Sequence, residues 1–284
     1  MIAITGATGQ LGRLVINELL KKVPASEVIA AVRSPEKAGD LKALGVTLRA
    51  ADYSKPDTLK SAFSGVDKLL LISSSEVGQR EAQHQTVIDA AKAAGVKFIA
   101  YTSLLHADTT TLGLSVEHRA TEAMLKASGV PYALLRNGWY TENYAASIAP
   151  ALAHHAFIGA VGEGRISSAA RVDYAAAAAE VISRDDQAGK VYELAGDESY
   201  TLAEFSAEIA KQSGEQVDYI NLPPAEFEAA LKGAGLPDAL AELLADSDAG
   251  AAQGGLFDDS RALSKLIGRP TTPYAEVIKA TLAK

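Results

Sequence analysis

The chain begins with Met1-Ile2-Ala3-Ile4-Thr5-Gly6-Ala7-Thr8-Gly9-Gln10-Leu11-Gly12, and this stretch predicts the fold. An apolar run precedes the glycines and an apolar helical pattern follows them, which is the context of a dinucleotide-binding turn. We expect Gly6 to permit the tight turn, Gly9 to let backbone N–H groups approach a pyrophosphate, and Gly12 to let the helix pack closely. A glycine-rich turn without a ligand is the alternative. The candidate pyrophosphate-binding residues are Gly6, Thr8, Gly9, Gln10, Leu11 and Gly12.

Short apolar runs alternate with helical patterns through the first half of the chain. Predicted strands cover residues 2–5, 28–32, 46–50, 68–72, 96–102 and 132–135. Predicted helices cover residues 10–22, 35–44, 79–94 and 115–128, and another begins at Lys55-Pro56. Because the strands are apolar throughout, they suit a parallel sheet that is covered on both faces. The predicted fold class is α/β, a Rossmann-type doubly wound parallel sheet with a smaller, mostly helical C-terminal lobe.

This rhythm changes after about residue 143. An alanine-rich helix is predicted over residues 171–183 and a short strand over 191–194. Thr201 and Glu204 form a capping-box pattern at the start of a further helix. We therefore expect an NADP-binding domain over residues 1–145, with later strand contributions from about 170–196, and a mainly substrate-binding lobe over 146–284.

Composition excludes several classes of function. The net charge is −8 and no basic block occurs, so a nucleic-acid partner is not expected. The absence of cysteine excludes disulfides and thiolate metal sites, and it suits the cytoplasm. No apolar stretch is long enough to insert in a membrane. The sequence leaves open whether the chain is a monomer or a homodimer.

No metal site is predicted either. The histidines lack zinc-site spacing, and the acidic residues between 246 and 259 lack calcium-loop spacing, so we interpret the acidic stretches as solvated faces. His118 and Glu122 are spaced i, i+4, which suggests a surface or cleft contact between them.

One arginine indicates which dinucleotide is bound. NAD-binding proteins usually place an acidic residue after the second strand to bind the ribose 2′-hydroxyl, and here that position holds Arg33. A guanidinium can pair with a 2′-phosphate, so NADPH is favoured, whereas a merely solvated arginine is the alternative. Topology places Asp52, after the third strand, near the adenine. It places Ser73, Ser74 and Ser75, after the fourth strand, near the nicotinamide half.

The glycine stretch and Arg33 occur together with later motifs in a known family. These motifs are Ser73-Ser74-Ser75-Glu76-Val77-Gly78-Gln79 and Arg136-Asn137-Gly138-Trp139-Tyr140-Thr141-Glu142-Asn143. Over essentially the whole chain, the sequence resembles the NmrA-like atypical short-chain dehydrogenases. Within them it is most similar to the bacterial NADPH-dependent quinone oxidoreductases of the second type, with triphenylmethane dye reductases as near relatives.

This resemblance implies two-electron reduction of a quinone substrate by NADPH, without flavin or metal. It also implies that Asn137, Gly138, Trp139, Glu142 and Arg165 contact the cofactor.

The sequence departs from ordinary short-chain dehydrogenases at their proton relay. Ser103 matches the usual serine, but His118 and Glu122 stand where a tyrosine and a lysine are expected. A glutamate cannot replace the lysine cation, so we do not expect the usual alcohol oxidation. We expect direct hydride transfer to a quinone instead. The candidate catalytic residues are Tyr140 and Asn143.

Trp139 and Phe257 are candidates for stacking on the substrate ring, although an aromatic residue is more often part of a core. Two alternatives to quinone reduction stay open. One is an NADP(H)-binding redox sensor without turnover, and the other is a dye or azo reductase.

Overall fold

The computed structural model describes residues 1–283, and its centre is a parallel β-sheet. The strands are β1 (Ile2–Ile4), β2 (Val28–Val32), β3 (Thr47–Ala50), β4 (Lys68–Leu71), β5 (Phe98–Leu104), β6 (Tyr132–Asn137) and β8 (Val191–Leu194). Their order in the seven-stranded sheet is β3-β2-β1-β4-β5-β6-β8, and β1 to β6 pair in parallel. The order reverses between β1 and β4, which is the switch point where open α/β sheets bind ligands. The predicted Rossmann-type fold is confirmed.

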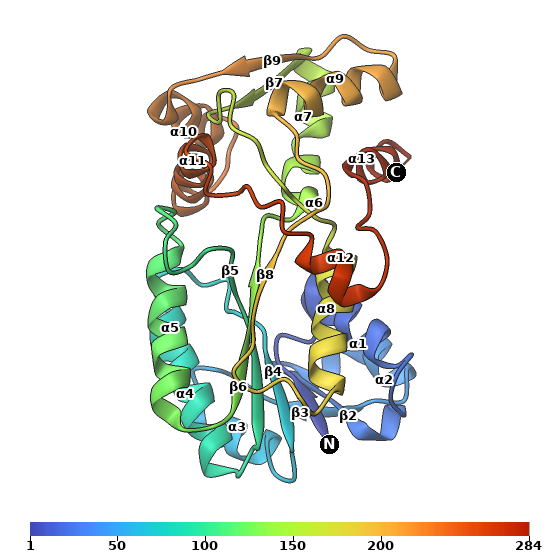
Figure 1. Cartoon of the computed structure of the whole chain (residues 1–284), viewed down its shortest axis with the longest axis vertical. Coiled ribbons are helices and arrows are strands. Elements are labelled where there is room, and N and C mark those ends of the chain that lie inside the picture. The colour runs from blue at the N-terminus through green and yellow to red at the C-terminus, as the bar shows by residue number, and fades with distance from the viewer. Residues whose placement is uncertain (284) are drawn as a thin grey trace. The chain divides into compact units, whose positions relative to one another are not determined.

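Helices cover both faces of this sheet (Figure 1). On one face lie α1 (Gln10–Leu19), α2 (Gly39–Ala43) and α8 (Arg171–Ser183), and on the other lie α3 (Pro56–Ala62), α4 (Arg80–Ala93) and α5 (Ser115–Ser128). Helix α1 packs along α8. The core beneath α3, α4 and α5 includes Phe63, Val87, Ile88 and Leu125, all fully buried. Burial on both sides explains why β1, β2, β4, β5 and β6 carry no alternating pattern, whereas the edge strands β3 and β8 are partly exposed.

The chain forms two compact units. Unit 1 comprises residues 1–104, 116–137 and 171–192, and unit 2 comprises 105–115, 138–170 and 193–284. The helices of unit 2 are α6 (Thr141–Ala145), α7 (Ile148–His154), α9 (Leu202–Ser213), α10 (Pro224–Gly233), α11 (Asp238–Ala252), α12 (Ala262–Ile267) and α13 (Tyr274–Leu282). Its strands β7 (Ala156–Gly159) and β9 (Asp218–Asn221) pair in parallel. Aromatic rings of Phe157, Tyr200, Phe205 and Tyr274 pack together within this unit.

The structure confirms some of the predicted helix and strand boundaries and corrects others. The Thr201–Glu204 capping box is confirmed, since each side chain accepts a hydrogen bond from the backbone N–H of the other residue. The single helix predicted over residues 35–44 is wrong. It is a 3₁₀ turn (η2, Pro35–Lys37) followed by α2, because Ala38 leaves the helical region (φ −109°, ψ 35°) with its side chain fully buried. The strand predicted over residues 96–102 runs from Phe98 to Leu104.

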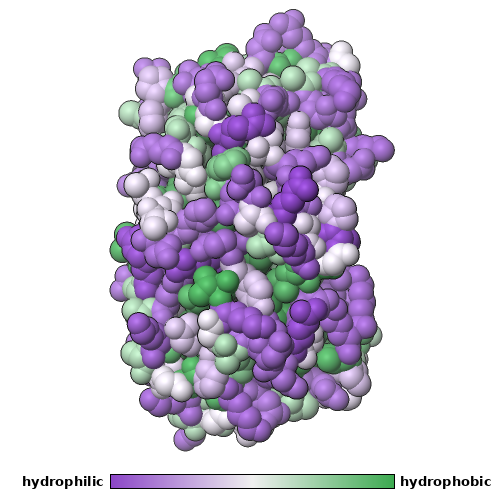
Figure 2. Space-filling model, in the orientation of Figure 1, coloured by the Kyte–Doolittle hydropathy of each residue, from purple (hydrophilic) through white to green (hydrophobic). Residues whose placement is uncertain are grey.

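The visible surface is mostly polar. Figure 2 shows apolar residues in separate patches among hydrophilic ones. Across residues 1–283, no helix is both long and apolar enough to cross a membrane.

Candidate functional site

The glycine loop (residues 6–12) joins β1 to α1 in unit 1. Gly6 has φ +58°, a left-handed conformation that favours glycine, and its carbonyl accepts a hydrogen bond from the Gly9 N–H at 2.9 Å. At Gly12, an added Cβ would lie 2.4 Å from the Gly6 carbonyl oxygen and 2.7 Å from the Ala7 Cα. Gly12 therefore permits the helix to close onto its own loop, a contact more local than the helix–sheet packing expected from the sequence.

The N-terminus of α1 suits an anion. Gly9 is the N-cap residue and supplies no side-chain cap to the first turn. The first amides of a helix have no intrahelical acceptor, and the helix dipole adds partial positive charge there. Gly6, Thr8, Gly9 and Gln10 are all solvent-exposed. This surface has the amide donors and the lack of side-chain bulk that a pyrophosphate requires.

Arg33 directly follows β2, and its side chain is 73% exposed. Its Nη1 lies 3.1 Å from Glu76 Oε1, a contact that the sequence did not predict. Asp52 follows β3, where its Oδ1 accepts a hydrogen bond from Ser54 N–H at 3.0 Å, while its own N–H donates to Thr58 Oγ1 at 2.9 Å. The Asp52 carboxylate thus takes part in its own turn.

Buried side chains hold the serine loop (residues 73–78), which follows β4. Ser74 N–H donates to His84 Nε2 at 2.9 Å, so Nε2 is an acceptor and the ring proton resides on Nδ1. Nδ1 lies 2.9 Å from Thr121 Oγ1, whose hydroxyl donates to the Glu117 carbonyl. The Glu117 carboxylate in turn accepts from Gly78 N–H at 2.9 Å. The donors and acceptors in this series of hydrogen bonds match only when His84 is neutral.

His84 makes stability depend on pH. Burial, with a smaller effect of the Arg80 charge, lowers its pKa from 6.5 to about 3. Between pH 6.5 and pH 3, His84 is protonated in the unfolded chain but stays neutral in the folded chain. The free energy of unfolding therefore falls as the pH drops from 6.5 towards 3. We expect His84→Gln to remove up to about 1.4 kcal/mol per pH unit of this slope. Urea unfolding of both proteins between pH 4 and 8 measures it, and equal slopes would contradict the assignment.

Glu122, which stands at the lysine position of the usual proton relay, forms a largely buried ion pair with Arg136. Arg136 donates to both carboxylate oxygens of Glu122, at 3.0 and 2.8 Å, and Ser103 Oγ donates to Glu122 Oε1 at 2.6 Å. The expected His118–Glu122 contact is wrong, because His118 is only 5% exposed and its Nδ1 lies 2.7 Å from the Tyr101 hydroxyl. Burial also holds the pKa of His118 well below its usual value. Sequence spacing could not distinguish this inward orientation from an i, i+4 pair.

Asn137 ends β6 in unit 1. Its Oδ1 is buried and has no hydrogen-bond partner among residues 1–283. An unpaired buried carbonyl is costly, so this atom is suited to a donor that arrives with a ligand. The observation agrees with the predicted cofactor role of Asn137.

The remaining candidate residues lie in unit 2. Gly138 N–H donates to the Leu194 carbonyl at 2.7 Å, and Tyr140 caps the start of α6, which carries Glu142 and Asn143. Trp139 is 7% exposed and packs near Tyr144, a position closer to a core residue than to a surface for stacking.

Two further candidates in unit 2 have exposed side chains. Arg165 donates from Nε to Ser199 Oγ at 2.9 Å and pairs with Glu204 at 3.3 Å. Phe257 is 36% exposed.

Unit 2 also contains a buried carboxylate in a stretch interpreted from sequence as solvated. Asp248 is 3% exposed, accepts from Tyr144 Oη at 3.1 Å and Ala160 N–H at 2.8 Å, and so joins α11 to α6 and to the end of β7. Burial raises its pKa to about 6. The prediction of a solvated acidic stretch is wrong for Asp248, because residue type alone does not reveal which face of a helix is packed. In the described chain, no three His, Cys, Asp or Glu side chains cluster as metal ligands.

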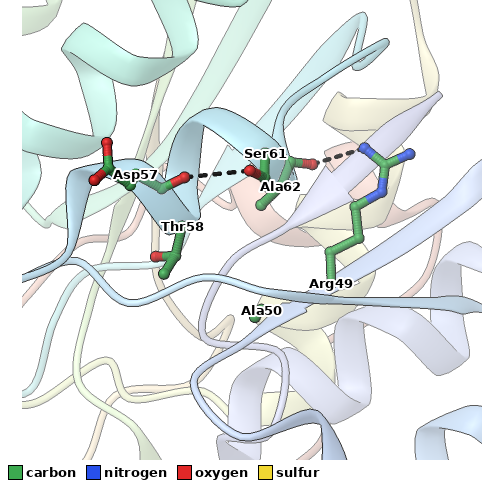
Figure 3. Close-up of a pocket in the computed structure, with 6 residues that line it drawn as sticks. All are labelled: Arg49, Ala50, Asp57, Thr58, Ser61 and Ala62. Carbon is green, nitrogen blue, oxygen red and sulfur yellow. Dashed lines mark hydrogen bonds between the residues drawn. The ribbon is translucent and has the colours of Figure 1, made fainter.

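A surface pocket of about 430 Å³ lies between β3 and α3 (Figure 3). Its lining is Arg49, Ala50, Asp57, Thr58, Ser61 and Ala62, which includes none of the predicted site residues. The Arg49 guanidinium is engaged by the carbonyls of Ala62 and Ser64, at 2.8 and 2.6 Å. This pocket therefore offers little to a dinucleotide phosphate.

The parallel sheet, the glycine loop and the uncapped start of α1 define a dinucleotide-binding protein of the Rossmann class. A family model described as NAD(P)H-binding matches residues 6–185. Quinone oxidoreductase 2 of Escherichia coli (strain K12) is 66% identical to this chain, and the matched region covers 98% of this chain and 97% of the E. coli protein. The chain therefore belongs to the NAD(P)H-binding family, among the NmrA-like oxidoreductases, as its sequence predicted.

Solved structures agree with this membership. The E. coli NADPH-dependent quinone oxidoreductase complexed with NADPH has a TM-score of 0.97 and 64% identity, covering 99% of this chain and 100% of that one. The Citrobacter sp. triphenylmethane reductase complexed with NADP(H) has a TM-score of 0.94 and 38% identity, covering 99% and 100%.

Proposed function

We propose that this chain catalyses the two-electron reduction of quinones by NADPH. The observation that carries the proposal is the whole-length likeness to E. coli quinone oxidoreductase 2, with 66% identity, together with the near-superimposable fold of an E. coli quinone oxidoreductase that holds NADPH. Identity of 66% over nearly the whole of both chains makes a shared site the simplest expectation.

The candidate residues fit this cofactor. The amides of the glycine loop and of the first turn of α1 would hold the pyrophosphate, and Arg33 would pair with the 2′-phosphate. Asp52 is proposed to lie near the adenine, and Ser73, Ser74 and Ser75 are proposed to lie near the ribose and the nicotinamide half. Asn137 would accept a hydrogen bond at its buried Oδ1. Gly138, Trp139 and Glu142 are proposed to contact the nicotinamide half, and Arg165 is proposed as a further contact of the cofactor. When bound, NADPH supplies a hydride.

The chain's own residues then have a modest chemical task. A quinone that accepts a hydride becomes a hydroquinone anion, which needs one proton. Glu122 is paired with Arg136, so no free lysine-like cation assists a tyrosine there. We assign to Tyr140 and Asn143 the role of neutral donors that hydrogen-bond the reduced oxygen, while water supplies the proton. Phe257, and Trp139 to a lesser degree because it is buried, are the candidates for stacking on the ring.

The test is the decay of NADPH absorbance with a simple benzoquinone or naphthoquinone. We expect oxidation whose rate is proportional to protein concentration. NADPH binding without accelerated oxidation would contradict the proposal and favour a redox sensor. A triphenylmethane dye should be included as a third acceptor because of the 38% identity to a reductase of that name. Comparable turnover of the dye would broaden the acceptor class.

A further inference from the structure

The arginine that we assign to the 2′-phosphate already has an anionic neighbour. Arg33 Nη1 and Glu76 Oε1 lie 3.1 Å apart, although the residues are 43 positions apart in sequence. They meet because Arg33 follows β2 and Glu76 follows β4, and these strands flank β1. The carboxyl ends of parallel strands reach the same edge of the sheet, so the contact is a direct result of topology.

Glu76 is held more firmly than Arg33. Its Oε2 accepts a hydrogen bond at 2.8 Å from Nε2 of Gln83, a residue that is only 8% exposed, on α4. Its backbone N–H donates to Ser74 Oγ at 3.1 Å. The side chain of Arg33 is 73% exposed, against 49% for Glu76. The carboxylate is therefore fixed in place, and the guanidinium is the partner that can move.

The ion pair is not needed to hold the serine loop. Ser74 N–H is anchored on His84, and Gly78 N–H is anchored on Glu117, both at 2.9 Å. Arg80 Nε also donates to the Ser74 carbonyl at 2.8 Å. An exposed ion pair adds little stability to a loop that is already fixed. The Glu76 carboxylate therefore acts mainly through its charge, which affects any ligand that binds Arg33.

We propose that Glu76 is a specificity-determining residue that lowers the preference for NADPH over NADH. This inference rests on the proposed function, in which Arg33 binds the 2′-phosphate. A carboxylate beside Arg33 competes for its N–H donors and repels the phosphate dianion. It does not oppose the uncharged 2′-hydroxyl of NADH, which can donate to a carboxylate. Arg33 and Glu76 therefore act in opposite directions on the same discrimination.

The test is the dissociation constants of Glu76→Gln for NADPH and NADH at one ionic strength. Gln can still accept the Gln83 hydrogen bond, so the loop should persist. We expect NADPH to bind about three- to tenfold tighter and NADH not to tighten, which raises the NADPH-over-NADH ratio. The matched control is Glu81→Gln, which removes the same charge from an exposed position in the first turn of α4. Its ratio should stay that of the parent.

A second variant separates failure of this inference from failure of the assignment beneath it. Arg33→Ala should lower the NADPH-over-NADH ratio, and 2′,5′-ADP should lose affinity while 5′-AMP does not. If Arg33→Ala lowers the NADPH-over-NADH ratio but Glu76→Gln leaves that ratio unchanged or lowers it, the role of Glu76 is overturned and the assignment of Arg33 stands. If Arg33→Ala leaves the ratio unchanged, both assignments are overturned.

Discussion

Gly9→Val is expected to abolish NADPH binding while leaving the protein folded. Gly9 is in an extended conformation (φ −71°, ψ 168°) that valine adopts readily. An added Cβ would lie 3.1 Å from the Gly6 carbonyl oxygen, so only a small shift is needed without ligand. The isopropyl group would then occupy the approach of the pyrophosphate to the amides of α1. We expect affinity to fall by at least about 100-fold, since several charge-assisted hydrogen bonds are lost.

Titration calorimetry gives the affinity, and thermal unfolding without cofactor gives the stability. Gly39→Val is the matched control, because Gly39 has no positive φ and nothing within 4 Å of an added Cβ. Gly12 would be a poorer test, since its Cβ would strike backbone atoms of the loop itself. A Gly9→Val protein that binds NADPH within tenfold of the parent would contradict the glycine loop as the pyrophosphate site.

Arg33→Asp is expected to reverse the cofactor preference. The change removes the cation proposed for the 2′-phosphate and installs a carboxylate, which repels that phosphate and can accept the 2′-hydroxyl of NADH. Affinity for NADPH should fall by about 100-fold, and NADH should become the better ligand. Because Arg33 is largely exposed, the fold should be unaffected.

Steady-state kinetics and dissociation constants with both cofactors test this reversal. Lys92→Asp, in the last turn of α4, carries the same change of charge away from β2 and should leave the preference intact. Unchanged NADPH affinity in Arg33→Asp would mean that Arg33 is only a surface charge.

Local chemistry allowed the first turn of the fold to be predicted. The left-handed φ of Gly6 and the close approach at Gly12 each require glycine, so their spacing is legible in the sequence. The capping box at Thr201 and Glu204 is equally local. Buried parallel strands have a simple signature because both faces are apolar.

Features set by tertiary contact were not predictable in this way. Strand β9 (Asp218–Asn221) is only four residues long and mostly exposed, so it carries no period that distinguishes it from a loop. The break at Ala38 is a non-helical backbone conformation (φ −109°, ψ 35°) at a residue type that normally favours helix. His84 and Asp248 are polar residues that are buried with partners far away in sequence, Thr121 and Tyr144 respectively.

The candidate site divides in the same way. Gly9 and Arg33 could be proposed from strand ends alone, because topology fixes where a βα turn must lie. Glu76 could not be paired with Arg33 without the strand order β2-β1-β4. Nor could Glu122 be paired with Arg136, because the partners occupy different elements, α5 and β6.

The packing of α8 on α1 has a consequence for how the protein is made. Helix α1 turns Leu11, Val15, Ile16 and Leu19 inward, and α8 belongs to the same compact unit although it begins only at Arg171. During translation, α1 emerges from the ribosome long before α8, which follows about 150 residues later in the chain. The face of α1 that contacts α8 therefore stays uncovered for much of translation, a state in which chaperones commonly bind.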